Sequence, residues 1–410
     1  LAAGGLASSV FQLVLNTTSG FVMAVSPIVA AAYGAKHHNQ IERIARQGLW
    51  LSVLIAVPMM VVISHLDNVM LRLGQVQQTV NLADGYLDYI LWGFFPAIGF
   101  AMLRGYVSAL SQARPVMVIV VLGTFANVIG NYVLGYGKFG FPRMVLEGLG
   151  LASGLSFWFM FLALFLYICK NQTLKQYPFW RELHRIRLKV LGQLLVVGVS
   201  IAVTIAVEYG LFTAVTFMMG NLDTTTLAAH QTVYQTVFLL FMVPLGMSYA
   251  VTVRVGQWVG QRDRQRTRQA GYVGIAAAAI FMGLTAIGLL VFRRPIIGIY
   301  LDASDPETLN VIKLAIPMLG IAALAQLLDG IQRVAMGSLY GLLDTRAPML
   351  LSIITFWGVG LASGYILGFI MGFGGMGLWI GQSIGVAAAG LIFLQRFHSL
   401  TSEKNFARIK

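Results

Sequence analysis

The chain has 410 residues, of which 58% are hydrophobic and only 10% are charged. Soluble globular proteins carry about 25% charged residues, so this composition excludes a soluble protein and favours one that lies in a lipid bilayer. The formal net charge of +13 would suit a nucleic acid partner. The distribution of the basic residues, described below, argues against that interpretation.

Apolar segments follow one another along the whole chain, separated by short polar connections that leave no room for a separate soluble domain. Each segment is roughly long enough to cross a hydrocarbon core of about 30 Å. The sequence therefore predicts an all-α polytopic membrane protein with eleven spans. These spans are 4–34, 43–66, 80–109, 115–137, 148–170, 188–219, 227–259, 269–292, 308–338, 347–370 and 375–397.

Basic residues are concentrated in alternate connections. Taken with the carboxyl-terminal tail, one set of connections holds 22 of the 28 Lys and Arg residues, with Arg333 counted in this set. Because cytoplasmic loops are enriched in Lys and Arg, we predict a cytoplasmic carboxyl terminus. The short connections favour a multi-pass protein of the cell inner (plasma) membrane. The dense basic connection 262–268 is expected to meet anionic lipid head groups and not nucleic acid.

The two halves of the chain resemble each other. Leu1-Ala2-Ala3 aligns with Leu227-Ala228-Ala229, and Gly148–Leu151 aligns with Gly375–Leu378. Six span positions separate matching segments, so both copies have the same orientation, as in parallel transporter repeats. We expect two pseudo-symmetric six-helix lobes, 1–175 and 176–410. The span 188–219 has no counterpart before Leu1, so by symmetry we expect that a first helix is missing from this chain.

Two carboxylates, Glu208 and Asp329, lie deep in apolar segments. A charge at the centre of a bilayer costs a few kcal/mol or more, so such groups usually face an internal cavity and serve a function. Either carboxylate could exchange protons, hold Na⁺ or pair with an organic cation. Thr204 is one helical turn before Glu208, and Gln326 and Gln332 share the helix face of Asp329. We therefore predict that these three residues line the cavity.

Two alternatives remain open for the polar residues. Asp329 and Arg333 are four residues apart and could neutralise each other within one helix. Asn127 and Asn131 share a face of the span 115–137, where they either hold helices together or line the cavity.

Prolines inside the apolar segments predict kinks, because each removes a backbone hydrogen bond. These prolines are Pro27, Pro96, Pro244 and Pro317.

No arrangement of residues typical of an enzyme accompanies these features. The chain has neither a Ser-His arrangement nor a His/Asp cluster that would suit catalysis, and its only cysteine, Cys169, cannot form an internal disulfide. We therefore expect no enzymatic activity and no cofactor.

Several segments spread over essentially the whole chain carry a family resemblance. They are Pro27–Gly34 with Arg46-Gln47-Gly48, Asn127–Tyr132, Tyr136–Gly140, Thr252–Gly256, Asp329–Gln332 and Asp344-Thr345-Arg346. Together they resemble the multidrug and toxic compound extrusion (MATE) family, in particular its NorM-type branch. The resemblance implies two six-helix lobes around a central cavity, and export of lipophilic organic cations in exchange for Na⁺ or H⁺. It also implies that Glu208 and Asp329 form the cation site, and that Asn127 and Asn131 act in the amino-terminal lobe.

Departures from the family pattern leave the coupling ion open. Ala325 stands where some relatives have a tyrosine, and no proline lies near Ser200. The alternative function is flipping of lipid-linked oligosaccharides, which would require a strongly cationic cavity. We expect small cationic substrates and membrane lipid as partners, no nucleic acid, and a monomeric protein.

Overall fold

The structure, a computed structural model, describes residues 2–67, 71, 77–140, 142–180, 182–301 and 306–407. The chain divides into two compact units, Leu1–Ile205 and Ala206–Lys410. The division falls inside helix α9 (Leu188–Leu222), so that the helix contributes to both units. The expected lobe boundary at 175/176 stays a prediction. Four of the basic residues used to predict the orientation lie outside the described residues: Arg72, Arg181, Arg408 and Lys410.

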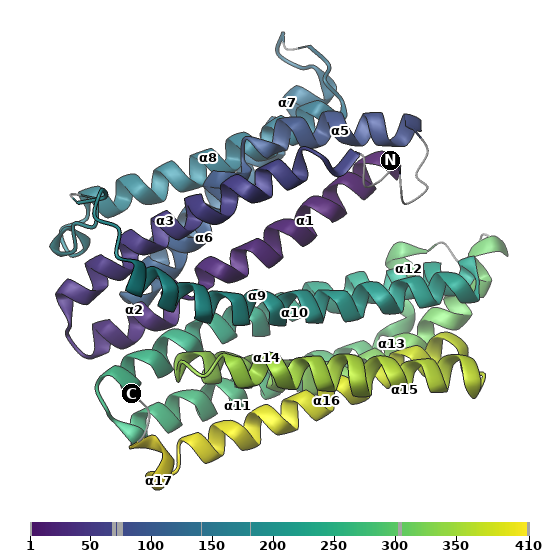
Figure 1. The fold of residues 1–410 in the computed structure, drawn as a ribbon. Coiled ribbons are helices and arrows are strands. Elements are labelled where there is room, and N and C mark those ends of the chain that lie inside the picture. The colour runs from purple at the N-terminus through teal and green to yellow at the C-terminus, as the bar shows by residue number, and fades with distance from the viewer. Residues whose placement is uncertain are drawn as a thin grey trace. The chain divides into compact units, whose positions relative to one another are not determined.

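The first unit is a bundle of long helices (Figure 1). Helix α8 packs against α5, α6 and α7, while α1 packs against α3, α5 and α6. The first part of α9 lies against α1, because Gly20 and Gly198 allow the backbones to approach each other closely. The elements are α1 (Ala2–Met23), α2 (Val25–Gly34), α3 (His38–Ile63), α5 (Gln77–Leu91), α6 (Phe94–Ala109), α7 (Ala113–Tyr136), α8 (Leu146–Lys170) and the short η1 (Leu174–Gln176).

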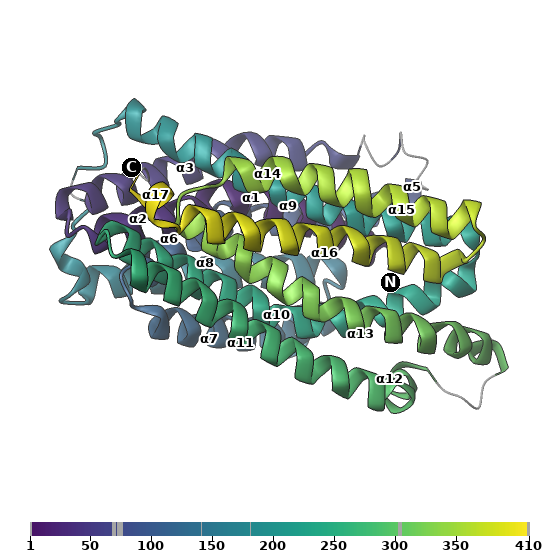
Figure 2. The ribbon, with the colours of Figure 1, turned by 90° about the horizontal axis from the view of Figure 1, so that it is seen from below.

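The second unit is organised around one central helix, α13 (Pro306–Gly341), which packs against α10, α11 and α16 (Figure 2). The rest of α9 belongs to this unit, where the Trp357 indole donates a hydrogen bond of 3.0 Å to the Val207 carbonyl. The other elements are α10 (Thr224–Gly260), α11 (Arg264–Val291), α12 (Arg293–Tyr300), α14 (Arg346–Ser352), the π-helical η2 (Ile353–Leu361) and η3 (Ile366–Ile370), α15 (Ala362–Tyr365), α16 (Gly374–Leu400) and α17 (Glu403–Phe406).

The predicted spans agree with the structure. Among the described residues, ten helices are long and apolar enough to cross a membrane, and the bent pair Ala83–Leu91 and Phe94–Ala109 supplies an eleventh candidate. The part of the chain that the structure describes contains no strand. The all-α polytopic fold is therefore confirmed.

Pro96 marks a real break in the chain. The two helices on either side of Trp92-Gly93 are bent by 52°. Pro96 has no N–H to offer the Trp92 carbonyl, and the Trp158 indole of α8 donates to that carbonyl instead, at 2.9 Å. Pro27 likewise lies in the first turn of α2, just after α1 ends. Pro244 and Pro317 differ, since both lie inside continuous helices.

The outer face of α11 shows why the fold needs lipid around it. Val273, Ile280, Leu284, Ile287 and Val291 recur at helical spacing, and each side chain is more than 60% exposed. An apolar stripe of this length is unfavourable in water and favourable against acyl chains.

The turn between α9 and α10 is stabilised by Asp223. Its carboxylate accepts hydrogen bonds of 2.6 Å from both the backbone N–H and the hydroxyl of Thr226. The Thr226 hydroxyl, followed by the backbone N–H, holds the pKa of this carboxyl below its ordinary value. Because the Asp223 pKa is lower in the folded protein than in the unfolded chain, the stabilisation is fully present above the unfolded-state pKa. It is lost as the pH falls through the folded-state pKa.

We therefore expect Asp223→Ala to lower the free energy of unfolding by about 1 kcal/mol at neutral pH, whereas Asn, which also caps helices, should cost much less. Thermal unfolding in detergent, at neutral pH and below the usual aspartate pKa, measures the difference. The difference between wild type and Asp223→Ala should shrink in acid. Equal effects of Ala and Asn would contradict the capping role.

Candidate functional site

Helix α13 carries the polar residues of the candidate site at the centre of the second unit. Gln326, Gln332 and Arg333 are buried, with exposed fractions of 4%, 0% and 7%, while Asp329 is half-buried. Because α13 packs on three other helices, these three buried side chains are enclosed by protein. The arrangement agrees with the rule that ionisable groups at membrane depth face the bundle interior.

A buried ion pair joins α9 to α13. Arg333 donates a hydrogen bond through Nη2 to Oε1 of Glu208, whose exposed fraction is 4%. The guanidinium carbon of Arg333 also lies 5.0 Å from the centre of the Phe241 ring on α10, within the range of a cation–π interaction. Within the described chain, Oε2 of Glu208 and Nε of Arg333 have no hydrogen-bond partner. The pair is thus incompletely satisfied.

The position of Arg333 corrects one sequence-based assignment. Arg333 was counted with the basic connections, yet it is buried inside a spanning helix. Neutralisation of Asp329 within the same helix was left open as an alternative, and the ion pair that Arg333 forms is with Glu208 on α9. The side chain of arginine is long enough to reach a neighbouring helix, so spacing along one helix does not decide its partner.

Asp329 lies within electrostatic range of both Glu208 and Arg333. The structure therefore brings together the two carboxylates that the sequence singled out. The cluster contains two carboxylates and one guanidinium, so an additional cation would be favoured there over an additional anion.

Aromatic side chains that were not predicted as site residues lie near this cluster. Tyr209 and Tyr234 lie within electrostatic range of Glu208. The Tyr234 ring contacts Phe212 and Phe238, with centroid separations of 5.8 and 5.7 Å. Aromatic faces beside a carboxylate suit organic cations, which gain from both the charge and the ring. The only signal in the sequence was the aromatic spacing of 234, 238 and 241 along one span.

The glutamines of α13 differ in their contacts. Gln326 donates to the Val237 carbonyl of α10 at 3.0 Å, so part of its amide holds two helices together. Among the described residues, neither polar atom of the Gln332 side chain has a hydrogen-bond partner, although the residue is fully buried. Their predicted role in lining a cavity stays a prediction.

Thr204 belongs with the first unit, and its hydroxyl donates to the Ser200 carbonyl of its own helix at 2.8 Å. Asn127 and Asn131 form a chain with α8, because Asn131 donates to Asn127 at 3.0 Å and Asn127 donates to Ser153 at 3.2 Å. These contacts favour a role in helix packing. The side-chain oxygen of Asn131 is buried and has no partner in the described chain, so a lining role also stays open.

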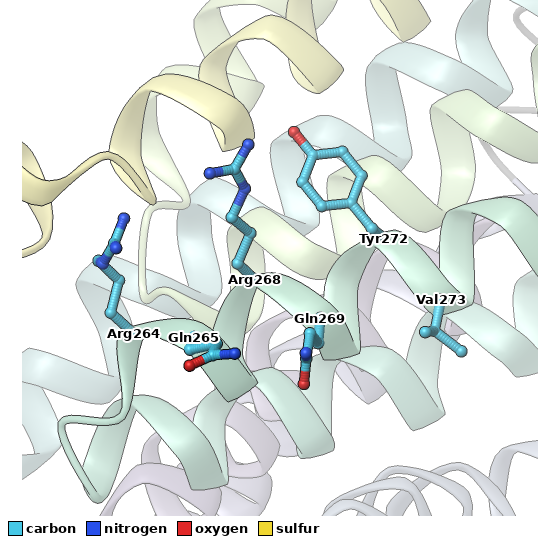
Figure 3. A pocket seen from close by; sticks show the side chains of 6 residues that line it. All are labelled: Arg264, Gln265, Arg268, Gln269, Tyr272 and Val273. Carbon is cyan, nitrogen blue, oxygen red and sulfur yellow. The ribbon is translucent and has the colours of Figure 1, made fainter.

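The basic connection forms a separate feature. A cavity of about 340 Å³ is lined by six residues near the start of α11, and Arg264, Arg268 and Tyr272 project from one helix face (Figure 3). Arg264 donates to Glu403 at 3.0 Å, and the Tyr272 hydroxyl lies 2.7 Å from Nδ1 of His398. Two arginines make this surface unsuitable for a cation, so the candidate cation site is the cluster on α13.

The fold and the site together define a multi-span helical membrane protein with an ionisable cluster inside one of its bundles. The MatE family model matches residues 1–133 and 200–366. A probable multidrug resistance protein NorM from Synechococcus sp. is 55% identical over 406 residues, covering 99% of this chain and 88% of the relative. A second NorM, from Synechocystis sp., is 48% identical over 404 residues, covering 98% and 88%.

Solved structures agree on the fold. The eukaryotic MATE transporter AtDTX14 has a TM-score of 0.87 at 18% identity and covers 100% of this chain and 89% of its own. A MATE structure in the bent conformation has a TM-score of 0.86 at 19% identity and covers 99% and 89%. The chain therefore belongs to the MatE family of membrane transporters, and the resemblance to the NorM-type branch is confirmed.

Proposed function

We propose that this chain is a secondary multidrug efflux transporter that exports lipophilic organic cations in exchange for Na⁺ or H⁺. The observation that carries the proposal is the cluster of buried Glu208 and Arg333 with half-buried Asp329, beside the Phe241 ring. The names of the NorM relatives, which describe probable multidrug resistance proteins, support the multidrug efflux part of the proposal.

Arg333 itself illustrates how the site would hold a substrate. Its guanidinium is a planar, delocalised cation that contacts a carboxylate on one side and lies over the Phe241 ring. A lipophilic organic cation has the same needs, namely a negative charge and an aromatic face. Tyr209 and Tyr234 lie within electrostatic range of Glu208, and the Phe238 ring contacts that of Tyr234.

The transport cycle follows from competition between the coupling ion and the organic cation for the acidic cluster. When the site faces outward, Na⁺ or protons bind there and weaken the hold on the organic cation, which leaves. The protein then exposes the site to the cytoplasm, where the coupling ion is released and a new substrate binds. The protein holds the acidic cluster out of bulk water, so that the cluster binds either the coupling ion or the organic cation. We propose no enzymatic step and no cofactor beyond the coupling ion.

The alternative, a lipid-linked oligosaccharide flippase, is less well supported. Such a substrate carries phosphate groups and needs a positively charged cavity, whereas this cluster has two carboxylates and one guanidinium. The basic surface around Arg264 and Arg268 is better suited to anionic lipid head groups at the membrane surface. We propose membrane lipid as the partner there.

The test is movement of a fluorescent organic cation in inverted vesicles that contain the protein, with a Na⁺ or a proton gradient imposed separately. Collapse of one gradient should release accumulated dye and identify the coupling ion. If neither gradient moves any cationic dye, the antiporter proposal fails and the flippase alternative gains.

We also propose that the protein lies in the inner membrane with its carboxyl terminus in the cytoplasm. Lys404 is exposed, and Cys169 is the only cysteine, so Lys404→Cys in a Cys169→Ser background gives a single reporter. A membrane-impermeant maleimide should label it in inverted vesicles and leave it unlabelled in right-side-out vesicles. The reverse pattern would overturn the orientation.

A further inference from the structure

The ion pair between Glu208 and Arg333 is closed to solvent on both sides. Its two residues are 4% and 7% exposed, and the Arg333 guanidinium is held further by the Phe241 ring. Opposite charges held together at this depth largely cancel each other for any third group. Separating them would leave two uncompensated charges inside the bundle, which is strongly unfavourable. The Arg333 guanidinium therefore already neutralises Glu208, which leaves Glu208 no need of a cation from solution.

Asp329 stands in a different position. It is half-buried, lies within electrostatic range of the pair, and does not receive the Arg333 hydrogen bond. The cluster as a whole has one carboxylate more than it has guanidinium groups. One additional positive charge makes the cluster electrically neutral. A second would leave a net positive charge in a medium of low dielectric constant, which is unfavourable.

We propose that Asp329 is the exchangeable carboxylate and that the site holds one positive charge at a time, so that its organic substrates are monovalent cations. Arg333 is a positioning residue that keeps Glu208 out of the exchange. The inference rests on the proposed cation antiport and specifies its substrate class. It also predicts the charge balance: one monovalent cation leaves for each Na⁺ or proton that enters.

A consequence for Glu208 follows from the helix geometry. Arg333 is one turn after Asp329 on α13. Once Glu208 is neutral, the freed guanidinium can turn to Asp329, the partner at i−4 on its own helix. Glu208→Gln should therefore inactivate transport indirectly, because Arg333 then pairs with Asp329. Removing Arg333 as well should restore an open Asp329, so Glu208→Gln combined with Arg333→Gln should recover transport.

Ethidium and propidium provide matched probes, because both carry the same phenanthridinium ring and differ by one positive charge. In proteoliposomes with the active ion gradient, the wild type should move ethidium at least about tenfold faster than propidium. Arg333→Gln, which leaves two uncompensated carboxylates, should reduce that ratio by about fivefold or more. Arg333→Lys keeps the charge and should keep the ratio. An unchanged ratio in Arg333→Gln would overturn the inference.

The double variant gives a second, independent readout. Glu208→Gln with Arg333→Gln should export ethidium at a rate within about threefold of wild type, with the wild-type preference for one charge. A double variant that folds but stays as inactive as Glu208→Gln would show that both carboxylates exchange, and would overturn the inference. Its elution as a monodisperse peak in size-exclusion chromatography establishes that it is folded.

Membrane potential separates this inference from the proposed function. Exchange of ethidium for one Na⁺ or one proton moves no net charge. The protein-dependent rate, which is the total ethidium rate minus the rate in protein-free vesicles, should therefore not change when a potential is imposed with K⁺ and valinomycin. If the wild type exports ethidium but the rate depends steeply on the potential, the one-charge inference fails while the antiporter proposal stands. If the wild type moves neither dye under any gradient, both fail.

Discussion

Asp329→Asn is expected to abolish coupled export of organic cations while leaving the protein folded in the membrane. The substitution keeps the size of the side chain and removes the carboxylate of the cluster that is not in the ion pair with Arg333. We expect the rate of ethidium export under an ion gradient to fall by at least about tenfold, since a difference of 1.4 kcal/mol in binding already gives that factor. Dye efflux from inverted vesicles measures it.

The matched control is Asp223→Asn, the same substitution at an exposed helix cap. Asparagine caps a helix about as well as aspartate, so both export and thermal stability should stay near wild type. Export by Asp329→Asn at the wild-type rate, with the same ion dependence, would remove Asp329 from the mechanism.

Breaking the Glu208–Arg333 ion pair should have the largest effect on stability of any single substitution in the second unit. Arg333→Leu leaves Glu208 buried and unpaired, and loss of one partner of a buried pair costs about 3–5 kcal/mol. Replacing both residues by leucine removes both charges, so the double variant should be more stable than either single variant. Thermal unfolding in detergent for the full double-mutant cycle measures the coupling.

An exposed ion pair supplies the comparison. Arg264 and Glu403 lie 3.0 Å apart, but the Glu403 side chain is 82% exposed. Glu403→Gln should therefore change the free energy of unfolding by less than about 1 kcal/mol. If the buried and the exposed pair contributed equally, water would have to reach Glu208 in the folded protein, and the closed ion pair would be the wrong description.

The membrane spans were predictable because burial in lipid acts on every residue of a segment. Twenty or so apolar residues in a row need no partner from elsewhere in the chain to be identified. The eleven predicted segments agree with the ten spans and the bent pair. The break at Trp92-Gly93 was harder to place, because it depends on Pro96 together with the Trp158 indole from another helix.

The candidate site divides in the same way. Glu208 and Asp329 stood out in the sequence because a carboxylate in an apolar segment is costly wherever its helix packs. The partner of Glu208 did not stand out in the sequence. Helical spacing pointed from Arg333 to Asp329, and only the structure shows that Arg333 on α13 reaches Glu208 on α9. The aromatic residues around the cluster were likewise hidden among the 25 Phe and 15 Tyr of the chain.

The sequence by itself determined that this protein spans the membrane many times, belongs to a family with repeated halves, and keeps two carboxylates at membrane depth. Those features follow from the cost of transferring each residue into lipid, which is a property of the residue and its near neighbours along the chain. Only the tertiary structure decided that Arg333 forms its ion pair with Glu208 on another helix, because the pairing of charges depends on which side chains the fold brings together.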